Sequence, residues 1–158
     1  MKHLPSILLS AILISTGACG QIQKQSTTET TDMEIKKSTF INASPAQLAG
    51  IRKALDLYTE AAIKGDSKIA EPAFAKTATM SFAQNDTLVS VPIQVLFDYY
   101  NTDCPQPANY EISVCDVADD AAIVRIDSQF GDTEFADMFT LVKDGDNWKI
   151  ISKIYHVK

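Results

Sequence analysis

Asp137 is the carboxylate of this sequence whose neighbours best suit acid–base chemistry. It stands between Phe135 and Phe139 in a run with the two-residue alternation of a β-strand, so the three side chains share one face. If this face is directed into the protein, apolar surroundings suit the carboxylate to the role of a general base. If the face is directed outward, Asp137 is a solvated residue or the partner of a lysine. The spacing leaves both interpretations open.

Tyr58 and His156 are two further side chains that could take part in proton transfer. Tyr58 belongs to the apolar stripe of a predicted helix, where it is either a pocket residue or a packed core tyrosine with a solvated hydroxyl group. His156 carries a ring that titrates near neutral pH, but its place near the end of the chain equally suits a surface histidine. We therefore treat Asp137, Tyr58 and His156 as catalytic candidates without assigning a reaction.

The composition limits the classes of protein to which the chain can belong. It has 158 residues and a formal net charge of −6, which disfavours nucleic-acid binding because that depends on basic patches. Nucleotide-binding glycine motifs, a nucleophile elbow and a Cys-x-x-Cys pair are missing from the sequence. We therefore expect no cofactor and no metal site, and we interpret the acidic run 144–147 as a hairpin turn rather than a calcium loop.

The first 19 residues have the order of an export signal. A basic start is followed by the apolar run Leu4–Ile14, which is too short to span a bilayer, and then by small residues. The sequence 16–19 (TGAC) resembles a bacterial lipobox, in which the cysteine is lipidated; an ordinary secretory signal with a chance cysteine is the alternative. We expect a signal peptide over 1–18, a lipid on Cys19, and a periplasmic or outer-membrane location in the bacterial cell envelope. In that oxidising compartment Cys104 and Cys115 could form a disulfide bond.

The folded domain is expected to span 44–158, after a polar tether over 19–43. Ser44 has the features of an N-cap, with proline next and Gln47 completing a capping box, and Gly65 suits the end of this first helix. A short helix near Ile69 and a third helix from Pro92 are expected as well. Strands are predicted over 78–83, 87–91, 110–117, 121–130, 134–142 and 148–157.

This order of elements predicts an α+β domain with helices on one face of a curved antiparallel sheet. The last four predicted strands are separated by short Asp-, Gly- and Asn-rich breaks, which indicates a meander. Strict alternation along the last strand would place one set of side chains on one face and the intervening set on the other. The first set is Trp148, Ile150, Ser152, Ile154 and His156, and the second is Lys149, Ile151, Lys153 and Tyr155.

The chain resembles the nuclear-transport-factor-2-like (NTF2-like, SnoaL-like) superfamily, and within it the family labelled putative lumazine-binding. The resemblance covers about 51–158, and its most specific parts are the stretches 135–145 (FADMFTLVKDG) and 148–156 (WKIISKIYH). It implies a curved sheet wrapped around the long first helix, with a pocket between them. It does not by itself transfer an activity.

The resemblance suggests three functions. The first is binding of a small ligand, such as an aromatic one, for which Tyr99 and Trp148 offer stacking surfaces. Arg125 and Asp127 lie two residues apart on one face of the predicted strand 121–130, where they either form an ion pair or line the edge of a pocket. The second is an isomerase- or dehydratase-like enzyme that uses a pocket aspartate with a tyrosine, and the third is a protein-interaction module that dimerises through its sheet. The candidate ligand-binding residues are Tyr58, Tyr99, Arg125, Asp137 and Trp148.

Overall fold

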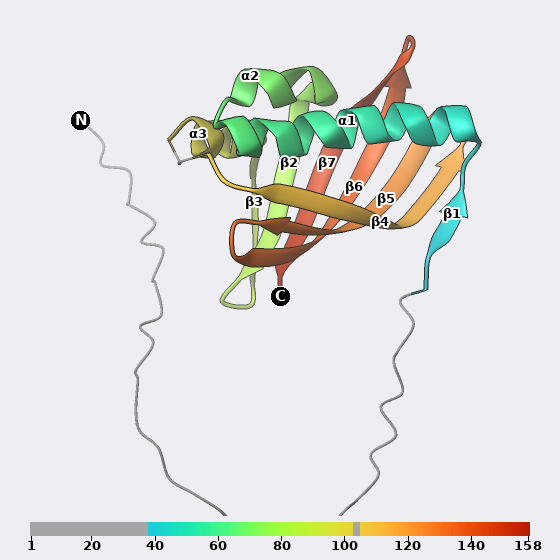
Figure 1. Ribbon diagram of the computed structural model, residues 1–158. Coiled ribbons are helices and arrows are strands. Elements are labelled where there is room, and N and C mark those ends of the chain that lie inside the picture. The colour runs from blue at the N-terminus through green and yellow to red at the C-terminus, as the bar shows by residue number, and fades with distance from the viewer. Residues whose placement is uncertain (1–37, 103–104) are drawn as a thin grey trace, which may run out of the picture. The chain divides into compact units, whose positions relative to one another are not determined.

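The computed structural model describes residues 38–102 and 105–158, which form a seven-stranded curved sheet with helices on one side (Figure 1). The strand order is β1-β4-β5-β6-β7-β2-β3, and the sheet does not close into a barrel. The strands are β1 (Phe40–Asn42), β2 (Phe74–Gln84), β3 (Thr87–Pro92), β4 (Ala108–Ala118), β5 (Ala121–Phe130), β6 (Thr133–Asp144) and β7 (Asn147–Val157). The helices are α1 (Pro45–Lys64), α2 (Ser67–Ala70), the 3-10 turn η1 (Glu71–Ala73) and α3 (Gln94–Thr102).

Helix α1 begins and ends where local sequence signals predict. The Ser44 hydroxyl group accepts a hydrogen bond from the backbone N–H of Gln47 at 3.3 Å, and the Gln47 side chain accepts one from the backbone N–H of Ser44 at 2.9 Å. This reciprocal capping box satisfies two N–H groups that the first helical turn would otherwise leave unpaired. At the other end Gly65 takes the left-handed conformation, with φ 63°.

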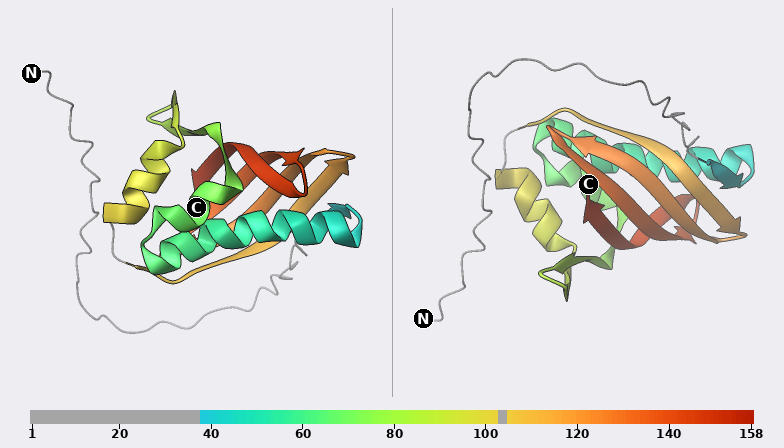
Figure 2. Two further views of the ribbon diagram at one scale, coloured as in Figure 1. Left: turned by 90° about the horizontal axis from the view of Figure 1, so that it is seen from above. Right: turned by 90° about the horizontal axis from the view of Figure 1, so that it is seen from below.

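The sheet curves around α1, which lies across its inner face (Figure 2). Strands β4 to β7 form the expected antiparallel meander, and β2 and β3 form the expected hairpin. Two pairings are parallel, β1 with β4 and β2 with β7. Because the β1 strand pairs with β4, the sheet takes in residues upstream of Ser44, where the domain was expected to begin.

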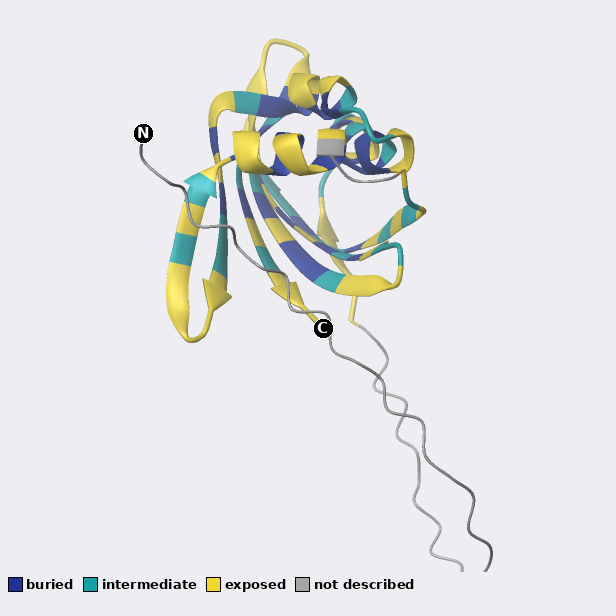
Figure 3. Cartoon of the chain, turned by 90° about the vertical axis from the view of Figure 1, so that its left-hand side faces the viewer, coloured by how far each residue is buried: buried dark blue, intermediate teal, exposed yellow. Residues whose placement is uncertain are grey.

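Burial alternates along the strands, so that one face of the sheet supplies the core (Figure 3). Inward residues such as Ile126, Leu141 and Ile150 pack against Ile51 and Leu55 of α1, and all five are fully buried. The fold is therefore the α+β architecture expected from the sequence, with helices on one face of a curved sheet. No helix among the described residues has the length and apolar character needed to cross a membrane.

Candidate functional site

Asp137 lies on the inner face of β6 and has no solvent exposure. Its Oδ1 accepts a hydrogen bond from Lys153 Nζ at 2.6 Å, and its Oδ2 accepts one from the Ser128 hydroxyl group at 2.5 Å. Both carboxylate oxygens therefore have partners, contributed by the neighbouring strands β5 and β7. The inward orientation was one of the two interpretations left open by the sequence. The lysine partner, which the sequence suggested only for an outward Asp137, is here buried beside it.

Lys153 reaches Asp137 because β7 carries an extra residue. In the pairing with β6, Leu141 is opposite Ile150 but Thr140 is opposite Ser152, so Ile151 forms a bulge. A bulge moves every later side chain of its strand to the opposite face. The strict alternation predicted for this strand is therefore wrong beyond Ile150: Lys153 is directed inward and is only 3% exposed.

Aromatic rings enclose the ammonium group of Lys153. Its Nζ lies 4.2 Å from the ring centroid of Tyr155, 5.7 Å from that of Tyr58 and 6.0 Å from that of Phe139. These distances are within the range of cation–π attraction, which strengthens when the cation is desolvated. Burial lowers the pKa of Lys153, while the negative charge of Asp137 and the hydrogen bond to it act in the opposite direction.

Tyr58 and Tyr100 remain protonated in this environment. Burial is the main cause that raises the pKa of both phenols, and the charge of Asp137 raises each further. The Tyr100 hydroxyl group also donates a hydrogen bond of 3.2 Å to the backbone carbonyl of Tyr58, which ties α3 to α1. Both tyrosines are thus neutral groups beside the ion pair. The position of Tyr58 on the inward stripe of α1 is the one predicted.

A second group of aromatic side chains lies further out and is half-buried. The rings of Phe82 and Tyr155 are 5.0 Å apart, Tyr155 and Phe135 are 5.9 Å apart, and Phe135 and Phe130 are 5.9 Å apart. We call these four residues the aromatic rim. They come from β2, β5, β6 and β7, and Tyr155 joins them to the buried Lys153. The rim thus connects the ion pair to the protein surface.

The other predicted site residues do not join Asp137 and Tyr58. Trp148 is buried against α1, where a Cβ atom added to Gly50 would lie 2.8 Å from its Cδ1 atom. Tyr99 is 47% exposed on α3. Arg125 and His156 are exposed on strands β5 and β7, with Arg125 on the outer face opposite Met138. Asp127 forms an ion pair with Lys158.

Cys115 is a free, fully buried thiol among the described residues, and burial raises its pKa. Cys104 and Cys19 lie outside the described residues. The disulfide bond and the lipid therefore remain predictions.

Over 38–102 and 105–158, His, Cys, Asp and Glu side chains form no cluster of three that could hold a metal ion.

Sequence reasoning missed Lys153, Ser128 and most of the aromatic rim. A lysine within the largely apolar run 148–157 (WKIISKIYHV) was a signal that could have been used, since a carboxylate buried on a neighbouring strand needs a cationic partner. The bulge that turns this lysine inward has no comparable signature in the sequence.

Comparison with known proteins agrees with this geometry and places the fold in the NTF2-like class. An NTF2-like protein of unknown function from Shewanella baltica is 36% identical, with a TM-score of 0.67, over 74% of this chain and 98% of that one. One from Methylobacillus flagellatus is 27% identical, with a TM-score of 0.67, over 77% and 99% of the two chains. A ketosteroid isomerase-like protein from Erwinia carotovora shares the fold at 16% identity and a TM-score of 0.55, covering 72% and 98%.

The family model described as "Putative lumazine-binding" matches residues 46–156, and the chain belongs to this family. No curated protein matches the sequence.

Proposed function

We propose that the domain binds a small planar aromatic molecule at the aromatic rim, with its polar edge directed to Lys153 and Asp137. The observation that carries this proposal is the buried Asp137–Lys153 ion pair beneath half-buried aromatic rings. A buried ion pair contributes little net stability, because desolvation offsets the attraction between the charges. Perturbed, desolvated charges are instead enriched at functional sites.

The chemistry of the site supports a ligand with both a flat ring and hydrogen-bond acceptors. Aromatic side chains stack on planar ligands, and the rim provides four of them. A lysine ammonium group has three N–H donors, of which one is used by Asp137. In this proposal, carbonyl oxygens of a ligand accept the other two. Lumazine, the molecule in the family's description, has this character, and we propose the pteridine class as the first to test.

Binding is tested by titrating the protein with lumazine, riboflavin and a steroid, following heat release. We expect the pteridine to bind, and the double variant Asp137→Leu/Lys153→Met to bind it ten- to a hundredfold more weakly, since a charge-assisted hydrogen bond contributes about 1.5–3 kcal/mol. Arg125→Ala, on the outer face of the sheet, is the matched control and should bind as the unaltered protein does. Equal binding by the double variant, or the absence of binding by every ligand, contradicts the proposal.

Catalysis of the isomerase or dehydratase type is our second candidate, with Asp137 and Tyr58 as the reacting groups. Their proximity in the protein interior favours it, since both are buried and Asp137 raises the pKa of Tyr58 by its charge. However, both oxygens of Asp137 already accept hydrogen bonds, which suits a fixed charge better than a base that must take a proton. If the unaltered protein converts a substrate by such a reaction, loss of that turnover in Asp137→Asn and its retention in Arg125→Ala would place catalysis ahead of binding.

We also propose that two copies associate through the outer face of the sheet. Ile123, Met138 and Ile154 are 41–54% exposed there, on the adjacent strands β5, β6 and β7. Apolar side chains that are contiguous on a surface are typical of interfaces. Light scattering should give the mass of a dimer, and Met138→Asp should give that of a monomer. A monomeric unaltered protein contradicts this proposal.

The location that we propose is the bacterial cell envelope, with the chain anchored by a lipid on Cys19. The support is the signal-like sequence 1–18 followed by a cysteine. Acyl chains supply about 0.8 kcal/mol of membrane affinity per buried CH₂ group. In cell fractionation Cys19→Ala should leave the membrane fraction, whereas Cys115→Ala should stay in it. Membrane association of Cys19→Ala contradicts the anchor.

A further inference from the structure

A cleft of about 930 Å³ opens where β2 separates from β7, away from the aromatic rim. The two strands pair at Phe74 and Ile150 and next at Thr79 and Ser152. Four residues of β2 therefore face the single bulged residue Ile151, and β2 bows away from its neighbour. The same bulge that turns Lys153 inward thus leaves Ile151 at the cleft. The volume falls within the range of about 300–1,000 Å³ that is typical of small-molecule sites.

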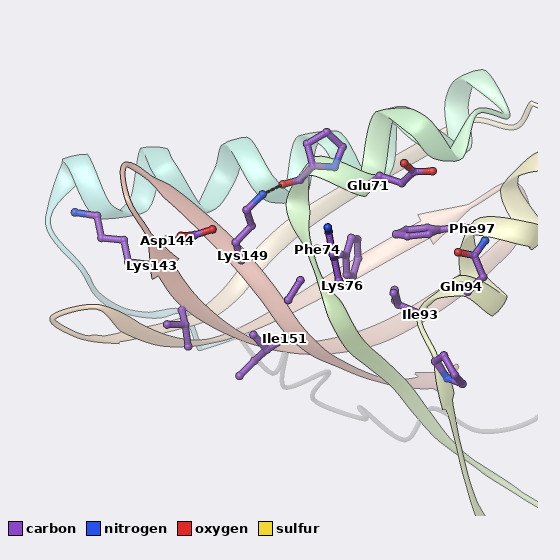
Figure 4. Close-up of a pocket in the computed structure, with 14 residues that line it drawn as sticks. Glu71, Phe74, Lys76, Ile93, Gln94, Phe97, Lys143, Asp144, Lys149 and Ile151 are labelled. Carbon is purple, nitrogen blue, oxygen red and sulfur yellow. Dashed lines mark hydrogen bonds between the residues drawn. The ribbon is translucent and has the colours of Figure 1, made fainter.

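The floor of the cleft is apolar and built from side chains of the core. The rings of Phe74 and Phe97 meet edge to face, with centroids 5.6 Å apart and an interplanar angle of 81°. Figure 4 shows these two rings side by side, with Ile93 and Ile151 below them. Phe74, Phe97 and Ile93 are each nearly buried, so their positions are fixed by packing. A fixed apolar floor favours a ligand with a rigid apolar body.

Lysine side chains give the edge of this cleft a positive charge, whereas the chain as a whole is negative. Lys76, Lys143 and Lys149 line it, against the acids Glu71 and Asp144, although the whole chain carries a net charge of −6. Lys149 Nζ donates a hydrogen bond of 2.5 Å to the carbonyl of Pro72 and so lies fixed beside the cleft.

Lys76 is the cation that we expect to hold a ligand's charge. It follows Phe74 by two residues on β2, and both residues line the cleft. In Figure 4, Lys143 is directed away from the other labelled side chains. Lys76 is exposed, and none of the ion pairs found among the described residues involves it. A cation that lines the cleft together with Phe74 and Phe97 can bind an anionic head while the apolar floor contacts the apolar body of the ligand.

We propose that the β2–β7 cleft is a second binding site, selective for small carboxylates with an apolar body. A free inorganic anion would gain nothing from the phenylalanine floor. A neutral apolar molecule would gain nothing from Lys76 and Lys149. A carboxylate attached to a ring or a branched chain uses both features. Three lysines line the cleft against two acids, so the net charge there is positive and attracts an anion.

The test is a titration of the full chain with 2-naphthoate, followed by amide NMR shifts. Shifts are expected at Lys76, Ile93 and Ile151, and 2-naphthamide, the uncharged match, should bind at least tenfold more weakly. Lys76→Ala should weaken naphthoate binding about tenfold, and Lys76→Arg should restore most of it. Lys68→Ala, an exposed lysine of α2 outside the cleft, is the control and should leave the affinity unchanged.

Three outcomes overturn the inference: equal affinity for the amide and the carboxylate, unchanged affinity in Lys76→Ala, or shifts confined to the aromatic rim. The result is separable from the proposed function. The double variant Asp137→Leu/Lys153→Met should lose lumazine binding and keep naphthoate binding, and Lys76→Ala should show the reverse.

Discussion

The Asp137–Lys153 site and the β2–β7 cleft lie on either side of one bulge, yet they use their charges differently. In the interior, Lys153 and Asp137 are both desolvated, and the Lys153 ammonium group donates a hydrogen bond to the Asp137 carboxylate. At the cleft, Lys76 is exposed and keeps its charge available beside an apolar floor. Removing a charge from the interior pair should therefore lower the free energy of unfolding, whereas removing the charge of Lys76 should hardly change it. Each prediction below tests this difference.

Breaking the interior pair should have the largest effect on stability. Lys153→Met leaves Asp137 as an unpaired buried charge, which typically lowers the free energy of unfolding by about 3–5 kcal/mol. Asp137→Leu/Lys153→Met removes both charges and should recover most of that loss, because an apolar pair of similar volume needs no desolvation. Urea denaturation measures both. A double variant no more stable than Lys153→Met would mean that the pair itself stabilises the fold.

Alkaline pH should weaken the fold through the buried tyrosines. The pKa values of Tyr58 and Tyr100 are raised in the folded protein, so above about pH 10 the unfolded chain loses phenol protons first. The folded state then binds more protons, and stability falls as the pH rises. Lys153 acts in the opposite direction, since its pKa is lowered, but it is a single group, whereas the pKa values of Tyr110 and Tyr155 are raised as well.

Tyr58→Phe should therefore reduce the slope of stability against pH in this alkaline range. Each pKa unit between folded and unfolded states corresponds to about 1.4 kcal/mol. Denaturation midpoints between about pH 9 and pH 11 measure the slope. Tyr99→Phe, at a half-exposed position on α3, is the control and should follow the unaltered protein. An equal slope for Tyr58→Phe would contradict the role of its buried phenol.

Gly50→Ala tests whether Trp148 is fixed in the core rather than available to a ligand. In an exposed helix this change gains about 1 kcal/mol. Here the new Cβ atom would lie 2.8 Å from Cδ1 of the indole ring, so packing strain of about 1–3 kcal/mol should outweigh the gain. The expected result is a modest loss of stability with a changed tryptophan emission spectrum. A more stable Gly50→Ala protein would show that the indole can move.

Lys76→Ala should have the smallest effect on folding. The side chain is exposed, and surface substitutions usually change stability by less than about 0.5 kcal/mol. Its denaturation curve should superimpose on that of the unaltered protein. Any loss of carboxylate binding would then result from the missing contact between Lys76 and the ligand, and not from unfolding. A destabilisation comparable to that of Lys153→Met would remove the distinction between the two sites.

Local signals in the sequence determined the helices, the hairpin and the meander. Ser44, Gln47 and Gly65 act through hydrogen bonds and backbone angles within a few residues of their own position, so the ends of α1 could be predicted. The period of two also placed Asp137 correctly on the same face as Phe139, and the helical stripe placed Tyr58.

The tertiary structure decided which partners these residues meet. The bulge at Ile151 depends on how β7 fits β6 and β2 together, and it reverses the faces of Lys153 and Tyr155 relative to simple alternation. The parallel pairing of β2 with β7 joins segments far apart in the chain, and the cleft exists because that pairing is interrupted. Local periodicity cannot encode either feature, because each is the result of packing between strands rather than of the conformation of one strand.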